Sequence, residues 1–278
     1  MSKKQKQEVG DHSTAIQVGG DLTVTSYQDI RAIFNDLFEL NFPKIQQIAA
    51  GKARESLDEM LEELRSAFER HKETIDKEKF TEPGIQYEME GIAIDVARRG
   101  KKSNMEMLCE LLCTITSRDC PELIELVAGE ARRAIPMLSK KHLSYLSVEV
   151  IVKEAEYEGK EVALINAHIA LVNNHIIHSK ELKFGDLQYL NSLGVINQRG
   201  IRTTGIIPNF IKNLPVFENK KDNEIKDYCK ENGMVNILNF FEIMEVCYIG
   251  SYYLTATGRL IGWLNLAKFS HVDIKKLF

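Results

Sequence analysis

The sequence has no run of about twenty apolar residues, the length that a helix needs to cross a bilayer, so no membrane span is predicted. Its first residues, MSKKQKQEVGDHS, are basic but are followed by no apolar stretch, which is not the pattern of a secretory signal. Five scattered cysteines, an odd number, favour a reducing compartment over a disulfide framework. We therefore expect a cytoplasmic protein with no membrane partner.

Three catalytic signatures are also missing. The sequence contains no G-x-x-x-x-G-K-[S/T] phosphate loop, no H-E-x-x-H metalloprotease motif and no G-x-S-x-G nucleophile elbow. Active residues can still converge from distant segments, but the favoured interpretation is a non-enzymatic protein without a cofactor.

Positive charge is not in excess either, since 36 Lys and Arg residues face 40 Asp and Glu residues. This balance argues against a general affinity for phosphate backbones, although a local basic face remains open.

What the sequence does contain is helical patterning. The 278 residues are 44% hydrophobic, enough to bury a core in one large or two modest domains. Apolar residues recur at helical spacing over residues 26–179, which predicts an all-helical bundle. Capping signals predict helix starts at Ser26, Ser103 and Ser139, and one helix should end at Gly100 after two arginines.

Residues 14–25, STAIQVGGDLTV, instead alternate like a half-buried strand. With two glycines at its middle, this arm is either one long strand or a tight hairpin. An isolated strand or hairpin is marginal in water because its backbone groups are unpaired and its apolar face is small. The simplest partner is the same arm of another subunit; docking on another protein or on the chain's own C-terminal module is the alternative. We predict homo-oligomerisation through Ile16, Val18, Gly19, Gly20, Leu22 and Val24.

After about residue 180 the pattern changes to helix, strand, strand, helix. The phrases DLQYLNSLGVI and YYLTATGRLIG resemble the flanks of the wing in winged-helix domains, separated here by a long insertion. The predicted fold is therefore mainly α. It comprises an N-terminal β arm over residues 1–25, a helical bundle over 26–179 and a C-terminal winged-helix-like α+β module over 180–278.

The N-terminal order STAIQVGGDLTV, then FELNFP, resembles a family of uncharacterised bacterial proteins that carry an Ile-Gln-x-Gly-Gly-Asp arm before a helical body. Similar arms occur near the start of some bacterial signalling and phage-defence proteins. We expect a non-enzymatic oligomeric interaction protein, a component of a bacterial stress or phage-defence system whose arm assembles it and whose C-terminal module contacts a protein partner. The resemblance carries over no activity.

The winged-helix resemblance leaves a DNA-binding regulator as the alternative function. Such a domain would place its second helix in the major groove and basic wing residues on phosphate. However, the candidate recognition helix around residues 186–192 has no Arg or Lys, which favours a protein-interaction or structural role for the module. The candidate nucleic-acid contacts are Lys140, Lys141, Arg199, Arg202 and Lys212.

Histidines 168, 175 and 178 are spaced so that two or three imidazoles could share one face of a helix and bind a metal. No carboxylate stands at a ligand spacing beside them. We favour the alternative that they line the boundary of an apolar helix, and we predict no metal site.

Cys109 and Cys113 are four residues apart and Cys120 follows, but no second pair completes a zinc site. Leucines surround the first two at helical spacing, so buried structural thiols are favoured. Gly258 and Gly262 form a G-x-x-x-G whose polar surroundings exclude a membrane dimer. Close helix packing is the favoured interpretation of these glycines.

Overall fold

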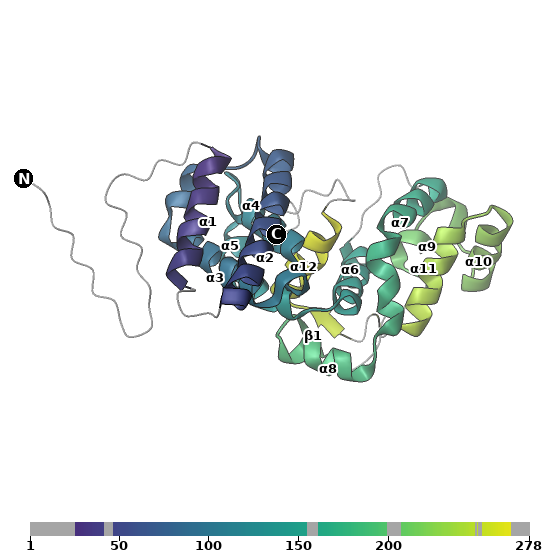
Figure 1. The fold of residues 1–278 in the computed structure, drawn as a ribbon. Coiled ribbons are helices and arrows are strands. Elements are labelled where there is room, and N and C mark those ends of the chain that lie inside the picture. Colours follow the sequence, from purple (N-terminus) through teal and green to yellow (C-terminus); the bar gives the residue numbers. More distant parts are fainter. Residues whose placement is uncertain are drawn as a thin grey trace, which may run out of the picture. The chain divides into compact units, whose positions relative to one another are not determined.

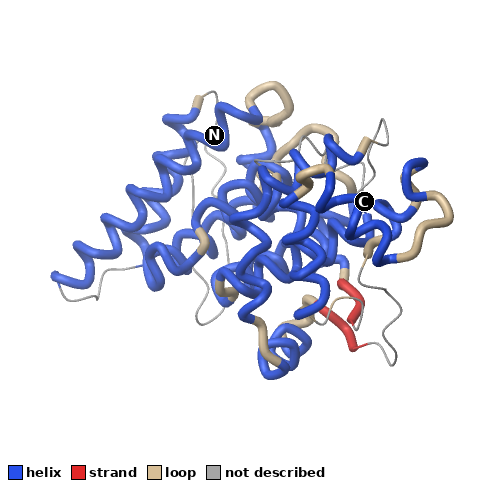
Figure 2. The backbone as a smooth tube through the Cα atoms, turned by 90° about the vertical axis from the view of Figure 1, so that its right-hand side faces the viewer, coloured by secondary structure: helices blue, strands red, loops and turns tan. Residues whose placement is uncertain are grey.

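The computed structural model describes residues 26–41, 47–154, 161–198, 207–247, 249 and 252–267. Within these residues the fold is mainly α, as predicted, and Figure 2 shows one short pair of strands among the helices. The chain forms two compact units, Met1–Asp119 and Cys120–Phe278. This division does not coincide with the predicted boundary between residues 179 and 180. The predicted arm, residues 1–25, lies outside the described residues.

The described residues of the first unit form α1 (Tyr27–Asn41), α2 (Gln47–His71), α3 (Pro83–Arg99) and α4 (Met105–Ile115) (Figure 1). Two 3-10 turns, Glu78–Thr81 and Gly100–Ser103, flank α3. Helix α2 packs against α3 and α4, and α1 packs against α3. Each helix buries the apolar stripe that its sequence predicts, and the core includes Phe34, Leu57, Leu61, Ile92, Val96 and Leu108.

Local signals explain most of the helix ends in this unit. The backbone N–H of Ser26 donates to Asp29 Oδ2 at 3.0 Å, and α1 begins at Tyr27 as predicted. Helix α3 ends at Arg99, and the predicted glycine Gly100 follows it with a φ of 55°. The predicted start at Ser103 is wrong. The Ser103 hydroxyl donates to the Gly100 carbonyl at 2.7 Å, and Asn104, in the left-handed region, precedes α4 instead.

The chain segments that follow α2 and α4 lie side by side. Ile75 and Ser117 form an antiparallel bridge. The backbone N–H of Asp76 donates to the Thr116 carbonyl at 2.8 Å. This pairing holds the C-terminal ends of the two helices together.

The second unit contains α5 (Glu122–Ala134), α6 (Lys140–Glu154), α7 (Val162–Ile176), α8 (Phe184–Ser192), β1 (Ile196–Gln198), α9 (Asn209–Lys212), α10 (Asp222–Glu231), α11 (Val235–Val246), β2 (Tyr252–Leu254) and α12 (Ala256–Leu266). Three 3-10 turns are Ile135–Met137, Ile177–Glu181 and Pro215–Phe217. Helix α6, which follows the predicted cap Ser139, is central: residues 142–151 are buried. Helices α7 and α12 pack against α6, α11 packs against α7, and α5 packs against α12.

The two strands of this unit pair antiparallel, with Ile196 opposite Leu254 and Gln198 opposite Tyr252. Helix α8 precedes β1 and α12 follows β2, so the predicted order of helix, strand, strand and helix is present. Helices α9, α10 and α11 occupy the long insertion between the strands. Thr255 caps α12 because its Oγ1 accepts from the Gly258 backbone N–H at 3.1 Å. The winged-helix assignment itself stays a prediction.

Candidate interaction surface

Several predicted site residues lie outside the described part of the chain. The six oligomerisation residues belong to the segment 1–25, and Arg199 and Arg202 belong to the segment 199–206. Oligomerisation through Ile16, Val18, Gly19, Gly20, Leu22 and Val24 therefore stays a prediction.

Three predicted nucleic-acid contacts are described, and two of them form ion pairs within the second unit. Lys141 Nζ lies 2.8 Å from Asp186 Oδ1, and Lys212 Nζ lies 2.7 Å from Asp222 Oδ1. Lys140 is exposed in the first turn of α6. A lysine that is paired with a carboxylate of its own chain presents less positive potential to a phosphate backbone. These pairs weaken the argument for a basic surface.

Asp186 joins the start of α8 to the start of α6. Its Oδ2 accepts from the Lys183 backbone N–H at 2.8 Å, and its Oδ1 lies 3.2 Å from His142 Nε2. His142 Nδ1 lies 3.2 Å from the backbone N–H of Ser139, which donates to it. Nε2 of the neutral ring therefore carries the proton and donates to Asp186.

This arrangement moves both pKa values downward. Burial opposes the ionised form of Asp186, but hydrogen bonds from Lys141, Lys183 and His142 outweigh it and lower the pKa to about 2. Burial is also the main influence on His142, whose pKa falls below 6.5 in spite of Asp186. The ring is therefore neutral near neutral pH, and the group acts as a joint between helices.

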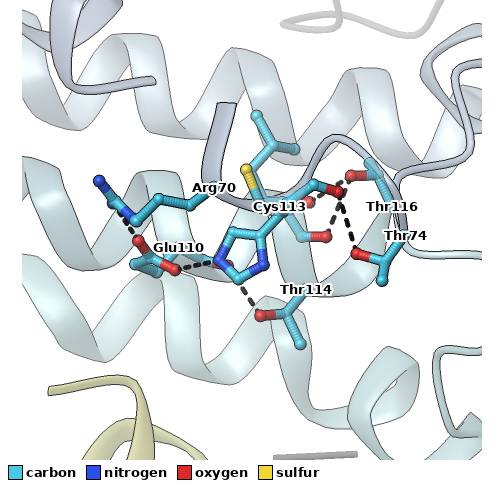
Figure 3. A network of polar contacts seen from close by, with 8 residues as sticks. Arg70, Thr74, Glu110, Cys113, Thr114 and Thr116 are labelled. Atoms are coloured by element: carbon cyan, nitrogen blue, oxygen red, sulfur yellow. Dashed lines mark hydrogen bonds and ion pairs between the residues drawn. The ribbon is translucent and has the colours of Figure 1, made fainter. Parts of the chain in front are cut away.

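Sequence reasoning missed the carboxylate of Glu110 on α4, whose side chain is 3% exposed. It forms an ion pair with Arg70, and its Oε2 lies 2.7 Å from His71 Nε2 (Figure 3). Arg70 and His71 end α2, so Glu110 ties α2 to α4. Burial raises the pKa of Glu110, but these two partners outweigh burial and bring it below 4.5.

Two threonine hydroxyl groups near Glu110 form hydrogen bonds with backbone carbonyls. Thr74 Oγ1 donates to the His71 carbonyl at 3.0 Å, and Thr114 Oγ1 donates to the Glu110 carbonyl at 2.8 Å (Figure 3). The nearby Cys113 is buried, and burial raises the pKa of its thiol well above 9.0. A protonated, buried thiol is a poor nucleophile. The chemistry present is therefore that of a structural ion pair.

His168 and His175 lie on α7, and His178 lies in the 3-10 turn that follows it. His178 Nδ1 lies 2.9 Å from Glu181 Oε1 in the turn after α7, and burial lowers the pKa of His168. Across the described ranges, no three His, Cys, Asp or Glu side chains gather in a way that could hold a metal ion. Cys109 and Cys113 are buried thiols, as predicted, whereas Cys120 is half-buried.

The two glycines of α12 provide close packing, as predicted. A Cβ on Gly262 would lie 2.7 Å from the Leu146 carbonyl oxygen of α6, and one on Gly258 would lie 1.8 Å from that of Val195. Beside this contact, Glu154 Oε2 accepts from Trp263 Nε1 at 2.8 Å. The glycines thus place α12 directly on its neighbours.

Helix α7 has apolar side chains on two opposite sides. Val162, Ile165, Ile169, Val172 and Ile176 point into the core. Ala163, Leu164, Ala167, Ala170, Leu171 and Asn174 are exposed, and we call these six residues the outer face of α7. Its two leucines are 53% and 61% exposed. The helix contains no Asp, Glu, Lys or Arg, a signal that was readable in the sequence.

Exposed leucines also occur on α5, in a different setting. Leu123 and Leu126 are 41% and 71% exposed. The charged residues Glu122, Glu125 and Glu130 are exposed on the same helix. Single apolar residues among charges are common on protein surfaces, whereas a continuous apolar face marks a contact site.

Comparison with known proteins places the chain without naming an activity. The model of an uncharacterised protein family matches residues 25–218, more than half of the chain. Searches of curated proteins and of solved structures found no match. Among the described residues, no helix is long and apolar enough to span a bilayer.

Proposed function

Since the chain belongs to this uncharacterised family, we propose from its own residues that it is a non-enzymatic interaction protein that forms homo-oligomers through the arm at residues 14–25. The outer face of α7 is the observation that carries the interaction role, and the alternating sequence of residues 14–25 is the basis for choosing the arm. It is an apolar, uncharged surface exposed on a folded unit, which is the composition of a protein contact.

The polar centres support a structural use of the buried charges. Glu110 is bound by Arg70 and His71, and Asp186 is bound by Lys141 and His142. Each of these centres joins two helices of one unit. The resemblance of the arm to those of bacterial signalling and phage-defence proteins supplies the setting, a bacterial stress or defence system in which the assembled protein contacts a partner.

Deletion of residues 1–25 tests assembly through the arm. The mass of the full chain and of the deletion variant would be measured by size-exclusion chromatography with light scattering over a range of concentrations. We expect the full chain to be oligomeric and the variant to have a smaller mass, because it lacks the strand that pairs between subunits. A variant that lacks only residues 1–13 is the control and should keep the mass of the full chain. Equal masses for all three would overturn assembly through the arm.

The second candidate is a DNA-binding regulator that uses the C-terminal winged-helix-like module. The antiparallel pairing of β1 with β2, between α8 and α12, favours it. The absence of Arg and Lys from α8 and the ion pairs of Lys141 and Lys212 disfavour it. Retention on a duplex-DNA column decides between the two, because phosphate contacts make retention fall steeply with salt. Salt-sensitive retention would favour DNA binding, and no retention at low salt would eliminate it.

A further inference from the structure

The outer face of α7 differs from the solvent-facing sides of the longer helices. On α2, the exposed positions carry charge, as at Glu55, Asp58 and Glu62. On α7, leucine and alanine occupy the same kind of position, and the inner side is already filled by the core. An apolar helix face is normally buried, and α7 has two such faces on opposite sides. We therefore expect the outer face of α7 to contact another protein surface.

We propose that this surface is α7 of a second copy of the chain, packed antiparallel across a two-fold axis. The inference rests on the proposed function, because it names the second contact of the same homo-oligomer. The pattern of the outer face is self-complementary. Leu164 and Leu171 are seven residues apart, two helical turns, so an antiparallel pair sets Leu164 of each copy beside Leu171 of the other.

The alanines make this contact close. In knobs-into-holes packing, a side chain inserts between four residues spaced i, i+3, i+4 and i+7 on the facing helix. Ala167, Ala170, Leu171 and Asn174 have this spacing and are all exposed. Leu164 of one copy fits this hole on the other, because two of its four walls are small. Antiparallel helices also place their macrodipoles in opposition.

The absence of charge on this face fits a second copy as the partner. A surface with no charged side chain selects an equally uncharged partner, because a charge buried against it would lose its hydration without compensation. The charge-free outer face of α7 meets that condition itself. Burial lowers the pKa of His168 on the same helix, so this imidazole adds no positive charge near neutral pH.

Area explains why this contact belongs to a larger assembly. Helix α7 has 15 residues and is about 22 Å long. One helix of that length covers less than the roughly 800 Å² that each partner contributes to a standard interface. The α7 pair therefore needs a further contact between the same two copies.

The test is the double variant Leu164→Glu/Leu171→Glu in the full chain. Both positions are exposed, so the variant should fold with an unchanged circular dichroism spectrum. We expect sedimentation equilibrium to show association weakened by about ten-fold or more, because two glutamates per copy would be buried in an uncharged contact. Leu126→Glu on α5 is the matched control, since Leu126 is 71% exposed and should tolerate the charge without a change in association.

A cross-link gives an independent readout of the two-fold axis. Ala167 lies near the centre of the predicted pair, so Ala167→Cys should form a covalent dimer on mild oxidation. Val216→Cys serves as the control, because Val216 is 37% exposed elsewhere in the unit and should form none. Equal cross-linking of the two variants would overturn the α7 pair.

The outcomes separate this inference from the proposed function. If deletion of residues 1–25 reduces the mass and the leucine variant does not, the arm stands and the α7 contact is overturned. If the leucine variant reduces the mass and the deletion does not, the α7 contact stands and assembly through the arm is overturned. Reduction by both supports both contacts, and a full chain that stays monomeric at every concentration overturns both.

Discussion

Two helix contacts, one in each compact unit, differ in the interaction that fixes them. In the first, the Glu110 carboxylate ties α4 to Arg70 and His71 at the end of α2. In the second, α12 approaches its neighbours so closely that Gly258 and Gly262 leave no room for a Cβ. An ion-pair joint depends on charge and hydrogen bonding, whereas a glycine contact depends on volume. These two contacts should therefore respond to different substitutions.

The largest effect is expected from Gly258→Ala in the second unit. The added Cβ would lie 1.8 Å from the Val195 carbonyl oxygen, so the backbone would have to shift. We expect the unfolding free energy of this unit to fall by about 3 kcal/mol. Urea denaturation followed by tryptophan fluorescence measures the change, because Trp263 on α12 is the one tryptophan in the sequence.

Gly185→Ala is the matched control for this substitution. Gly185 lies on α8 of the same unit and has nothing within 4 Å of the position that a Cβ would take. Alanine there should leave the denaturation curve in place or move it to higher urea, because alanine favours a helix over glycine. Curves that coincide for the two glycine variants would contradict the close approach of α12.

The next effect is expected in the first unit, from Glu110→Ala. The substitution removes the carboxylate that Arg70 and His71 bind and leaves a gap beside α2. Both partners are more than one third exposed and can turn to water, so we expect a loss of about 2 kcal/mol. Hydrogen exchange should quicken in α2 and α4, while the fluorescence of Trp263 follows the wild-type curve.

Glu55→Ala on α2 is the control for Glu110, because Glu55 is exposed to solvent. Its removal should change the unfolding free energy by less than about 0.5 kcal/mol. Equal hydrogen-exchange rates in the Glu110 and Glu55 variants would contradict the role of Glu110 in joining α2 to α4.

The smallest effect is a difference in pH dependence between the units. Burial lowers the pKa of His142 and of His168 in the second unit below 6.5. Unfolding lets these rings bind protons more readily, so their contribution is complete above 6.5 and is lost as pH falls through the folded pKa values. Glu110 has a pKa below 4.5, so its contribution persists to lower pH. Acidification from about pH 7 to about pH 5.5 should weaken the second unit first.

Fluorescence of Trp263 in urea at the two pH values measures this loss. In the variant His142→Asn/His168→Gln, the midpoint should depend less on pH, because neither new side chain titrates. The amide oxygen of the introduced asparagine can also accept from the Ser139 backbone N–H in place of the ring nitrogen. A variant whose midpoint shifts with pH as much as that of the wild type would show that these rings are not responsible.

Local signals in the sequence predicted much of the fold. The start of α1 at Tyr27, the end of α3 at Gly100 and the start of α6 after Ser139 were all readable from caps. The close packing of Gly258 and Gly262 and the burial of Cys109 and Cys113 also followed from spacing. The start of α4 was not predicted correctly, because the Ser103 hydroxyl donates to the Gly100 carbonyl and the chain turns at Asn104.

The Glu110 joint was not predictable from the sequence. Its partners Arg70 and His71 are about forty residues away along the chain, and an isolated glutamate in a helix normally indicates a solvent-facing position. The exposure of α7 was equally hidden. Its apolar sequence predicted a helix, but no pattern indicated which of its two apolar sides the core would cover.

The sequence by itself determined several helix ends, the strand order around the insertion and the set of apolar residues, because caps, glycines and hydrophobic period act within a few residues. Only the tertiary structure decided which cations meet Glu110 and which side of α7 remains exposed. Those outcomes depend on how distant helices pack, and packing selects among surfaces that the local pattern leaves equivalent.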